Sequence, residues 1–281
     1  MRSDITYDAR GQLNSYNEHS RTHGVDEETD TQWTALGYDE QGQLSGYRQT
    51  TALPYETRVI VRNNIVYDST SRMASLRERE ENGRFITETA MSCVMYDGAG
   101  RMTGYTRDSR RFTGDGSLDL SSRSVRTDTD YAGDFVRAYS EVNTSSADQV
   151  RETVEVSGIV YGRRGYQTAA LTASRRQGSV SMLEWQVDAD SGDVTQVERQ
   201  VALDSRSLSL RCNQQYDSRG DLTAFDDYAI NAGGSVTTHT SQENITYDQR
   251  HRRLGWQQTS RRYGGGVDAT VALTRSDVMY N

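Results

Sequence analysis

The residues best placed to do repeated chemistry are those of a Tyr-Asp heptapeptide that recurs along the chain. Residues 7–13 read YDARGQL, and close variants begin at Tyr38, Tyr96 and Tyr216. Each copy carries a carboxylate among polar residues and a glycine. The pattern is therefore either one site multiplied or one turn built many times, and the elements around it must decide which.

The heptapeptide belongs to a tandem repeat. Its starts, taken at the Tyr-Asp pair or its nearest equivalent, are spaced by about 30 residues, a size typical of units that bury a face only against their neighbours. We predict a single repeat array over residues 1–281, with units starting near Tyr7, Tyr38, Tyr67, Tyr96, Tyr131, Tyr161, Val187, Tyr216 and Tyr247.

Each unit contains two turn signals separated by strand-like stretches. In residues 8–11 (DARG), Asp and Gly occupy the positions that a type I turn prefers. A looser signal lies mid-unit, as in residues 81–83 (ENG), and stretches such as residues 58–61 (RVIV) favour strands. The prediction is an all-β fold of tandem β-hairpins, forming one antiparallel meander of roughly 18–20 strands, twisted or partly curled, with almost no helix.

Two positions of the unit are regularly apolar. When the Tyr is counted as position 0, position 6 is Leu or Met and position 9 is mostly aromatic. Because three residues separate them, a straight strand would place them on opposite faces, so either both faces are covered or a bulge follows the turn. We expect columns of Leu13, Leu44, Met73, Met102 and Leu222 at position 6, and of Tyr16, Tyr47, Leu76, Tyr105, Phe225 and Trp256 at position 9.

Residues 96–106, YDGAGRMTGYT, resemble the YD repeat of RHS proteins and teneurins, in which Tyr-Asp is followed by two variable residues, Gly-Arg-Leu and a short strand. The resemblance implies successive hairpins in a continuous sheet. In that family the sheet spirals into a hollow shell, often around a toxin or peptide.

Composition excludes several classes of function. Only 34% of the residues are apolar, and the mean hydropathy is −0.82. All 32 basic residues are Arg, dispersed among 40 acidic ones for a net charge of −8, so we expect no nucleic-acid partner. No apolar run approaches the ~18 residues of a membrane helix, so we expect no membrane insertion.

The repeated aspartates could bind cations, but one carboxylate per turn offers too few oxygens for Ca²⁺, so we predict that they cap turns. His19 and His23 are four residues apart, yet no Cys or further His pair completes a zinc set. The acid pairs at residues 27–28 and 226–227 are adjacent on predicted strands, and their side chains would point to opposite faces. Residues 264–266 (GGG) precede no helix, which argues against a phosphate loop. We expect no catalytic, cofactor-binding or metal-binding residues.

Cys93 and Cys212 precede Tyr-Asp starts that lie four repeats apart. Eight strands at ~4.8 Å would place them on the order of 38 Å apart across a flat sheet, beyond the ~7 Å limit for a disulfide. We predict two free thiols.

These observations predict a non-enzymatic repeat protein, structural or interaction-bearing, located outside the cell or on its surface, although residues 1–8 form no signal peptide. The chain starts at a Tyr-Asp turn and ends in the same phase at Tyr280-Asn281, so we expect end-to-end self-association into a filament or neighbouring repeats of a larger chain. The alternative is a carbohydrate-binding surface that uses rings such as Trp33, Trp185 and Trp256, or a segment of a shell that encloses a cargo.

Overall fold

The computed structural model describes residues 1–21, 28–53, 56–146, 150–162, 164–187, 194–231, 236–276 and 278. These residues form 17 antiparallel strands, which confirms the predicted all-β meander of tandem hairpins. The chain comprises two compact units, Met1–Asp128 and Thr129–Asn281. Along the described residues no helix is long and apolar enough to span a membrane.

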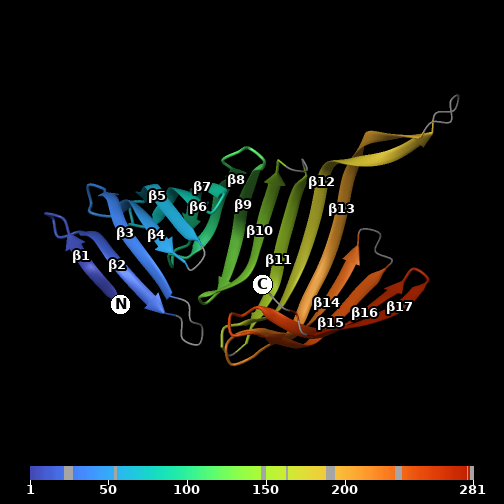
Figure 1. The fold of residues 1–281 in the computed structure, drawn as a ribbon. Helices are drawn as coiled ribbons and strands as arrows, with labels where there is room; N and C mark the ends of the chain where they lie inside the picture. Colours follow the sequence, from blue (N-terminus) through green and yellow to red (C-terminus); the bar gives the residue numbers. More distant parts are fainter. Residues whose placement is uncertain are drawn as a thin grey trace. The chain divides into compact units, whose positions relative to one another are not determined.

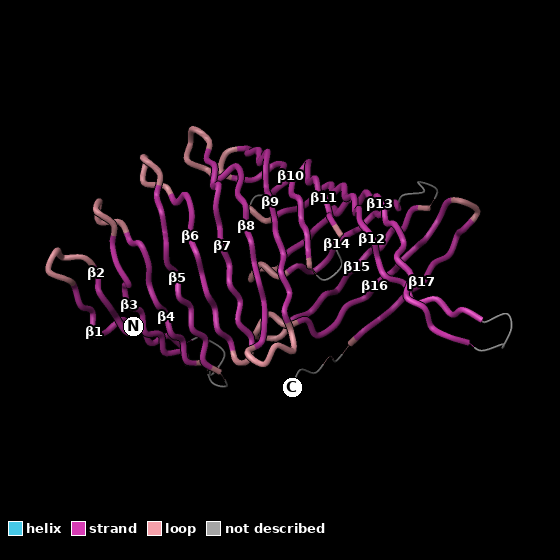
Figure 2. Tube along the Cα trace, turned by 90° about the horizontal axis from the view of Figure 1, so that it is seen from above, coloured by secondary structure: helices cyan, strands magenta, loops and turns pink. Residues whose placement is uncertain are grey.

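In the first unit each strand pairs with the strand that follows it in the chain. Figure 2 shows β5 to β8 running side by side. The strands are β1 (Arg2–Tyr7), β2 (Leu13–Arg21), β3 (Glu28–Tyr38), β4 (Leu44–Ala52), β5 (Thr57–Tyr67), β6 (Met73–Asn82), β7 (Phe85–Tyr96), β8 (Met102–Thr113) and β9 (Asp119–Ala132), whose last residues belong to the second unit.

The second unit continues the same pattern of pairing from β10 to β17. Its strands are β10 (Phe135–Ser145), β11 (Arg151–Tyr161), β12 (Gln167–Val187), β13 (Val194–Tyr216), β14 (Leu222–Asn231), β15 (Thr237–Tyr247), β16 (Arg253–Gly264) and β17 (Val267–Arg275).

One long hairpin occupies the stretch where we expected two repeats. Strands β12 and β13 pair without interruption from Ala170 opposite Arg211 to Val187 opposite Val194, and Figure 1 shows them extending past β11 and β14. Strand β12 contains no Asn-Gly or Gly-Gly turn signal. Gly178 therefore remains a paired strand residue, opposite Leu203. Val187 therefore ends a strand far from the Tyr-Asp turns, and the strand count is 17 rather than the expected 18–20.

The strand register shifts on both sides of the Tyr-Asp turns. In β7 the register shifts between Ser92 and Met95, and Cys93 adopts a left-handed backbone with φ of 52°. A second shift follows the turn, as expected: Met95 lies opposite Gly104 and Tyr96 opposite Met102, which leaves Thr103 as an extra residue between the position-6 and position-9 side chains of β8. The same left-handed conformation, three residues before the next start, occurs at Asp4, Asn64, Asp128, Gly158, Asn213 and Asn244.

The hydrophobic core is thin and is distributed along the repeats. Among the described residues no large side chain is completely removed from solvent. The most buried apolar positions are those two residues before the Tyr, such as Ile65 and Ile245, and those in the position-9 column, such as Leu76. Cross-strand side-chain pairs, each worth roughly 0.2–1 kcal/mol, therefore carry much of the stability of such a sheet.

Candidate functional site: the Tyr-Asp turns and the contacts between repeats

Each Tyr-Asp segment forms a hydrogen-bonded turn around its aspartate. The Asp97 amide donates to the Arg101 carbonyl, and the Gly100 amide donates to the Asp97 carbonyl, both at 3.0 Å. The Asp97 carboxylate accepts from the amides of Ala99 and Arg101, both at 2.9 Å. This confirms the predicted capping role. The same capping by side chain recurs at Asp8, Asp39, Asp68, Asp217 and Asp248.

The pKa of the carboxyl group is lowered at Asp68, Asp97, Asp217 and Asp248. The backbone amide of Arg101 and then its guanidinium, 2.7 Å from the second carboxylate oxygen, lower the pKa of Asp97 below its ordinary value. The pKa of Asp217 is lowered in the same way, first by the amide of Asp221. A general base needs a pKa near the working pH and a free oxygen, and Asp97 offers neither. The turn aspartates are structural acceptors.

One turn forms without an aspartate, which separates the turn from any site chemistry. The Tyr161 repeat has Gly162 where the others have Asp. The Gly162 amide still donates to the Tyr166 carbonyl and the Gly165 amide to the Gly162 carbonyl, both at 2.9 Å. The backbone geometry therefore survives the loss of the carboxylate, as a turn allows and a repeated catalytic site would not.

The tyrosine of each turn connects one repeat to the repeat before it. The Tyr96 hydroxyl donates to the Met73 carbonyl at 2.7 Å, and Met73 is position 6 of the preceding unit. We call this contact the tyrosine clamp. Tyr216 makes it with Gln167, position 6 of the unit that starts at Tyr161, so the long hairpin belongs to a single repeat. The clamp also joins Tyr38 to Leu13, Tyr67 to Leu44 and Tyr247 to Leu222.

The side chain at position 5 often covers the tyrosine ring of the following repeat. The Arg72 guanidinium lies 4.7 Å from the centre of the Tyr96 ring. In the second unit an aromatic ring takes this place: Tyr166 stacks on Tyr216 with centroids 4.9 Å apart. Because the ring is covered and the hydroxyl is bonded, burial raises the pKa of Tyr96, and its phenol is held protonated.

The position-9 column pairs with a fixed position on the next repeat, five residues before its Tyr. Tyr16 lies opposite Trp33, with ring centroids 5.4 Å apart, and the Trp33 and Tyr47 rings are 5.8 Å apart. At Tyr47 and Tyr105 the partner is an arginine whose guanidinium covers the ring, Arg62 and Arg126 respectively. The predicted column is confirmed as an inter-repeat contact.

Two recurring signals escaped the sequence analysis. Asp, Asn or Gly precedes most Tyr starts by three residues, and these residue types tolerate the left-handed backbone of the bulge. Position 8 is small in seven of the units, and where it is Gly46, Gly104 or Gly255 it lies close to the backbone of the next strand. At Gly104 a Cβ atom would lie 2.8 Å from the Arg126 carbonyl oxygen. The other position-8 residues are Ser15, Gly46, Ser75, Ala169, Ala224 and Gly255.

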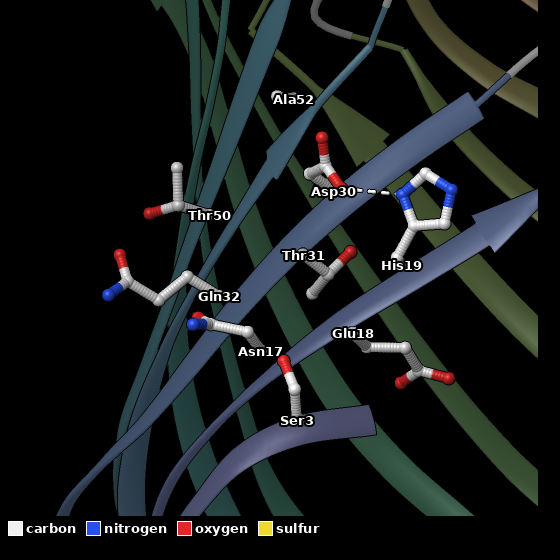
Figure 3. Close-up of a pocket in the computed structure, with 9 residues that line it drawn as sticks. All are labelled: Ser3, Asn17, Glu18, His19, Asp30, Thr31, Gln32, Thr50 and Ala52. Atoms are coloured by element: carbon white, nitrogen blue, oxygen red, sulfur yellow. Dashed lines mark hydrogen bonds and ion pairs between the residues drawn. The ribbon is translucent and has the colours of Figure 1, made fainter. Parts of the chain in front are cut away.

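An open groove of about 480 Å³ lies on the first four strands (Figure 3). In it His19 Nδ1 lies 2.8 Å from Asp30 Oδ1, and both side chains are more than half exposed. The nearby Ser3 hydroxyl donates to Asp4 rather than to the imidazole, so no activated nucleophile joins the pair. The groove is lined by Ser3, Asn17, Glu18, His19, Asp30, Thr31, Gln32, Thr50 and Ala52.

The strand register assembles a second polar cluster in the second unit that sequence spacing did not reveal. His239 Nε2 lies 3.1 Å from Asp226 Oδ1, and the His239 ring stacks on Tyr228 at 4.2 Å. Cys212 is the cross-strand partner of Asp226. Burial and the negative charge of Asp226 raise the pKa of the Cys212 thiol, which suppresses the thiolate that a catalytic cysteine needs.

Two of the remaining candidates, His23 and Glu27, lie outside the described residues. Asp226 bonds to His239, whereas its neighbour Asp227 pairs with Arg211 at 2.7 Å, so the two acids serve different contacts. Gly264 ends β16, and residues 265–266 form the turn between β16 and β17. Cys93 and Cys212 are free thiols. Within the described ranges, no three His, Cys, Asp or Glu side chains gather closely enough to hold a metal ion.

Comparison with family models, with curated proteins and with solved structures gave no match to this chain.

Proposed function

We propose that this chain is a non-enzymatic structural and interaction-bearing repeat array, a scaffold that acts outside the cell or on its surface. The observation that carries the proposal is the tyrosine clamp. In five repeats the same phenol bonds to the same carbonyl position of the preceding unit, as in Tyr96 to Met73. The most repeated feature of the sequence is thereby used to join units.

The surface of the sheet supports a scaffold role. Charged pairs run across the strands, as in Arg79 with Glu88 at 2.8 Å and Arg110 with Asp119 at 2.6 Å. Such exposed pairs are individually worth little, about 0–1 kcal/mol, but in number they stabilise a sheet without a thick core. They also leave a polar surface for a partner.

An activity screen tests the proposal. We expect no turnover of ester, glycoside or peptide substrates by the purified chain. The proposal would be overturned by turnover that the single substitution His19→Ala or His239→Ala abolishes while the unfolding midpoint stays unchanged, because those residues form the only histidine–carboxylate pairs away from the turns in the described chain.

Carbohydrate binding is the second candidate, and the contiguous row of Tyr16, Trp33 and Tyr47 favours it. Against it, Trp33 is only 8% exposed, and the Arg253 guanidinium lies 3.8 Å from the Trp256 ring centre. The Trp185 side chain is not among those that the structure describes. A glycan array decides: binding that Tyr16→Ala removes supports this candidate, and the absence of any bound glycan eliminates it.

The similarity of residues 96–106 to YD repeats leads us to propose kinship with RHS proteins and teneurins. The clamp, the capped turn and the small residue at position 8 provide a structural description of the repeat against which a solved member of that family can be compared. Kinship with that family also gives the alternative to a scaffold its other form, in which this chain is a segment of a shell that encloses a cargo.

A further inference from the structure

The free edge of β17 differs from every paired strand of its unit. It joins β16 in unbroken register from Arg275 opposite Trp256 to Val267 opposite Gly264, and among the described residues it pairs with no other strand. All nine of its residues are exposed. By contrast, β15, which has a strand on each side, contains a buried isoleucine and a run of half-buried residues.

The exposed edge carries an apolar face. Because side chains alternate along a strand, Val267, Ala269, Val271 and Leu273 share one face. Val271 is 66% exposed and Leu273 49% exposed. Sheet edges are normally protected by bulges, Pro, inward charges or short length. In β17 the register has no irregularity, and only its two end regions carry charge.

The opposite edge of the array shows what such protection looks like. Strand β1 has only six residues, two of which, Arg2 and Asp4, are charged. Its register is broken between Ser3 and Thr6, and Asp4 has a left-handed backbone with φ of 51°. The two edge strands are therefore not equivalent, and of the two β17 alone presents a long regular template for another strand.

We propose that β17 pairs antiparallel with β17 of a second copy of this chain, about a two-fold axis at Val271. This places Val271 opposite the partner's Val271, and Ala269 opposite the partner's Leu273, so the two apolar faces become one. Asp268 then lies opposite the partner's Thr274, and Arg275 lies opposite the partner's Val267. The strand is self-complementary, with no like charges opposed, which favours a second copy over an unrelated partner.

The pairing rests on the proposed scaffold function and specifies its partner, and self-association tests it. We expect a molar mass near twice 31.6 kDa at high concentration that falls on dilution. Val271→Lys places two ammonium groups face to face and weakens association by more than about tenfold. Ile5→Lys, the matched change on β1, leaves association unchanged. Unfolding midpoints of both variants verify that each is folded.

Cross-linking tests the register directly. In a chain with Cys93→Ser and Cys212→Ser, we expect Val271→Cys to form a symmetric disulfide, whereas Ala269→Cys cross-links only when mixed with Leu273→Cys. A monomeric mass at every concentration, open-ended assemblies, or association lost through Ile5→Lys rather than Val271→Lys would overturn the pairing. None of these results would produce catalytic turnover, so failure of the pairing is distinguishable from failure of the scaffold function.

Discussion

The phenol of Tyr96 donates a 2.7 Å hydrogen bond to the backbone carbonyl of Met73, a residue 23 positions earlier in the chain. The bond fixes the start of one repeat to the first strand residue after the turn of the repeat before it. It also explains why the position is Tyr rather than Phe, since the ring supplies packing and the hydroxyl satisfies a backbone acceptor. Recurrence of the Tyr-Asp pair is thus a consequence of how repeats are joined.

The turn aspartates predict a loss of stability in acid. Hydrogen bonds from Arg101, first from its amide, hold the pKa of Asp97 below its ordinary value of 3.8. A lowered folded-state pKa contributes stability above the unfolded pKa and loses it as the pH falls through the folded value. We expect the urea midpoint to drop below about pH 4, and to drop less in Asp97→Asn.

The control for this measurement is Glu40→Gln, which removes the same charge from an exposed side chain of another Tyr-Asp turn. It should retain the full acid dependence of the parent chain. Equal acid dependence in Asp97→Asn and in Glu40→Gln would show that the capping carboxylate does not contribute to the loss of stability in acid.

The left-handed bulge predicts opposite effects for the same substitution at the two cysteines. Cys93 has φ of 52°, whereas Cys212 has an ordinary strand conformation. Cys93→Gly should relieve backbone strain and raise the free energy of unfolding by about 1 kcal/mol. Cys212→Gly should lower it by about 0.5–1 kcal/mol, because glycine in a regular strand costs chain entropy. Chemical denaturation measures both, and a loss in both variants would contradict the strain argument.

The position-9 column predicts that truncating a side chain that packs against the next repeat lowers the free energy of unfolding. Leu76 is 8% exposed and lies opposite Met91 of the next strand. Leu76→Ala should lower the free energy of unfolding by about 2 kcal/mol, at the low end for a buried leucine because the packing is one layer thick. The same change at Leu36, which is 55% exposed, should cost less than about 0.5 kcal/mol. Similar losses at both leucines would show that the column is not a packed contact.

Local turn chemistry made much of the fold predictable. The Asp and Gly of residues 97–100 predict a turn from local chemistry alone. Leu76 and Tyr47 both occupy position 9 of their units, and only a repeat explains why that position is regularly apolar or aromatic. The direction in which the Tyr96 hydroxyl points was not predictable, because it depends on the register of two strands separated by a bulge. The signal for that bulge, Asn or Asp three residues before the Tyr, was present in the sequence and was missed.

The long hairpin marks the limit of arguments from periodicity. Val187 begins a Tyr-Asp-like stretch at about the right spacing, but nothing between Gln167 and Val187 breaks the strand. Strand pairing therefore runs on, with Gly178 opposite Leu203, and the next true start is Tyr216. The cluster of Cys212, Asp226 and His239 was equally inaccessible, since the register and not the spacing brings those side chains together.

The tyrosine clamp is tested most directly by removing single hydroxyl groups and measuring urea unfolding midpoints. Tyr7→Phe is the matched control, because that side chain is 64% exposed. Each clamp variant should lose about 1 kcal/mol, the net value of a typical intramolecular hydrogen bond, while the control stays within about 0.5 kcal/mol of the parent. Unchanged midpoints in the clamp variants, or an equal loss in Tyr7→Phe, would contradict the account. The clamp variants are Tyr→Phe at Tyr38, Tyr67, Tyr96, Tyr216 and Tyr247.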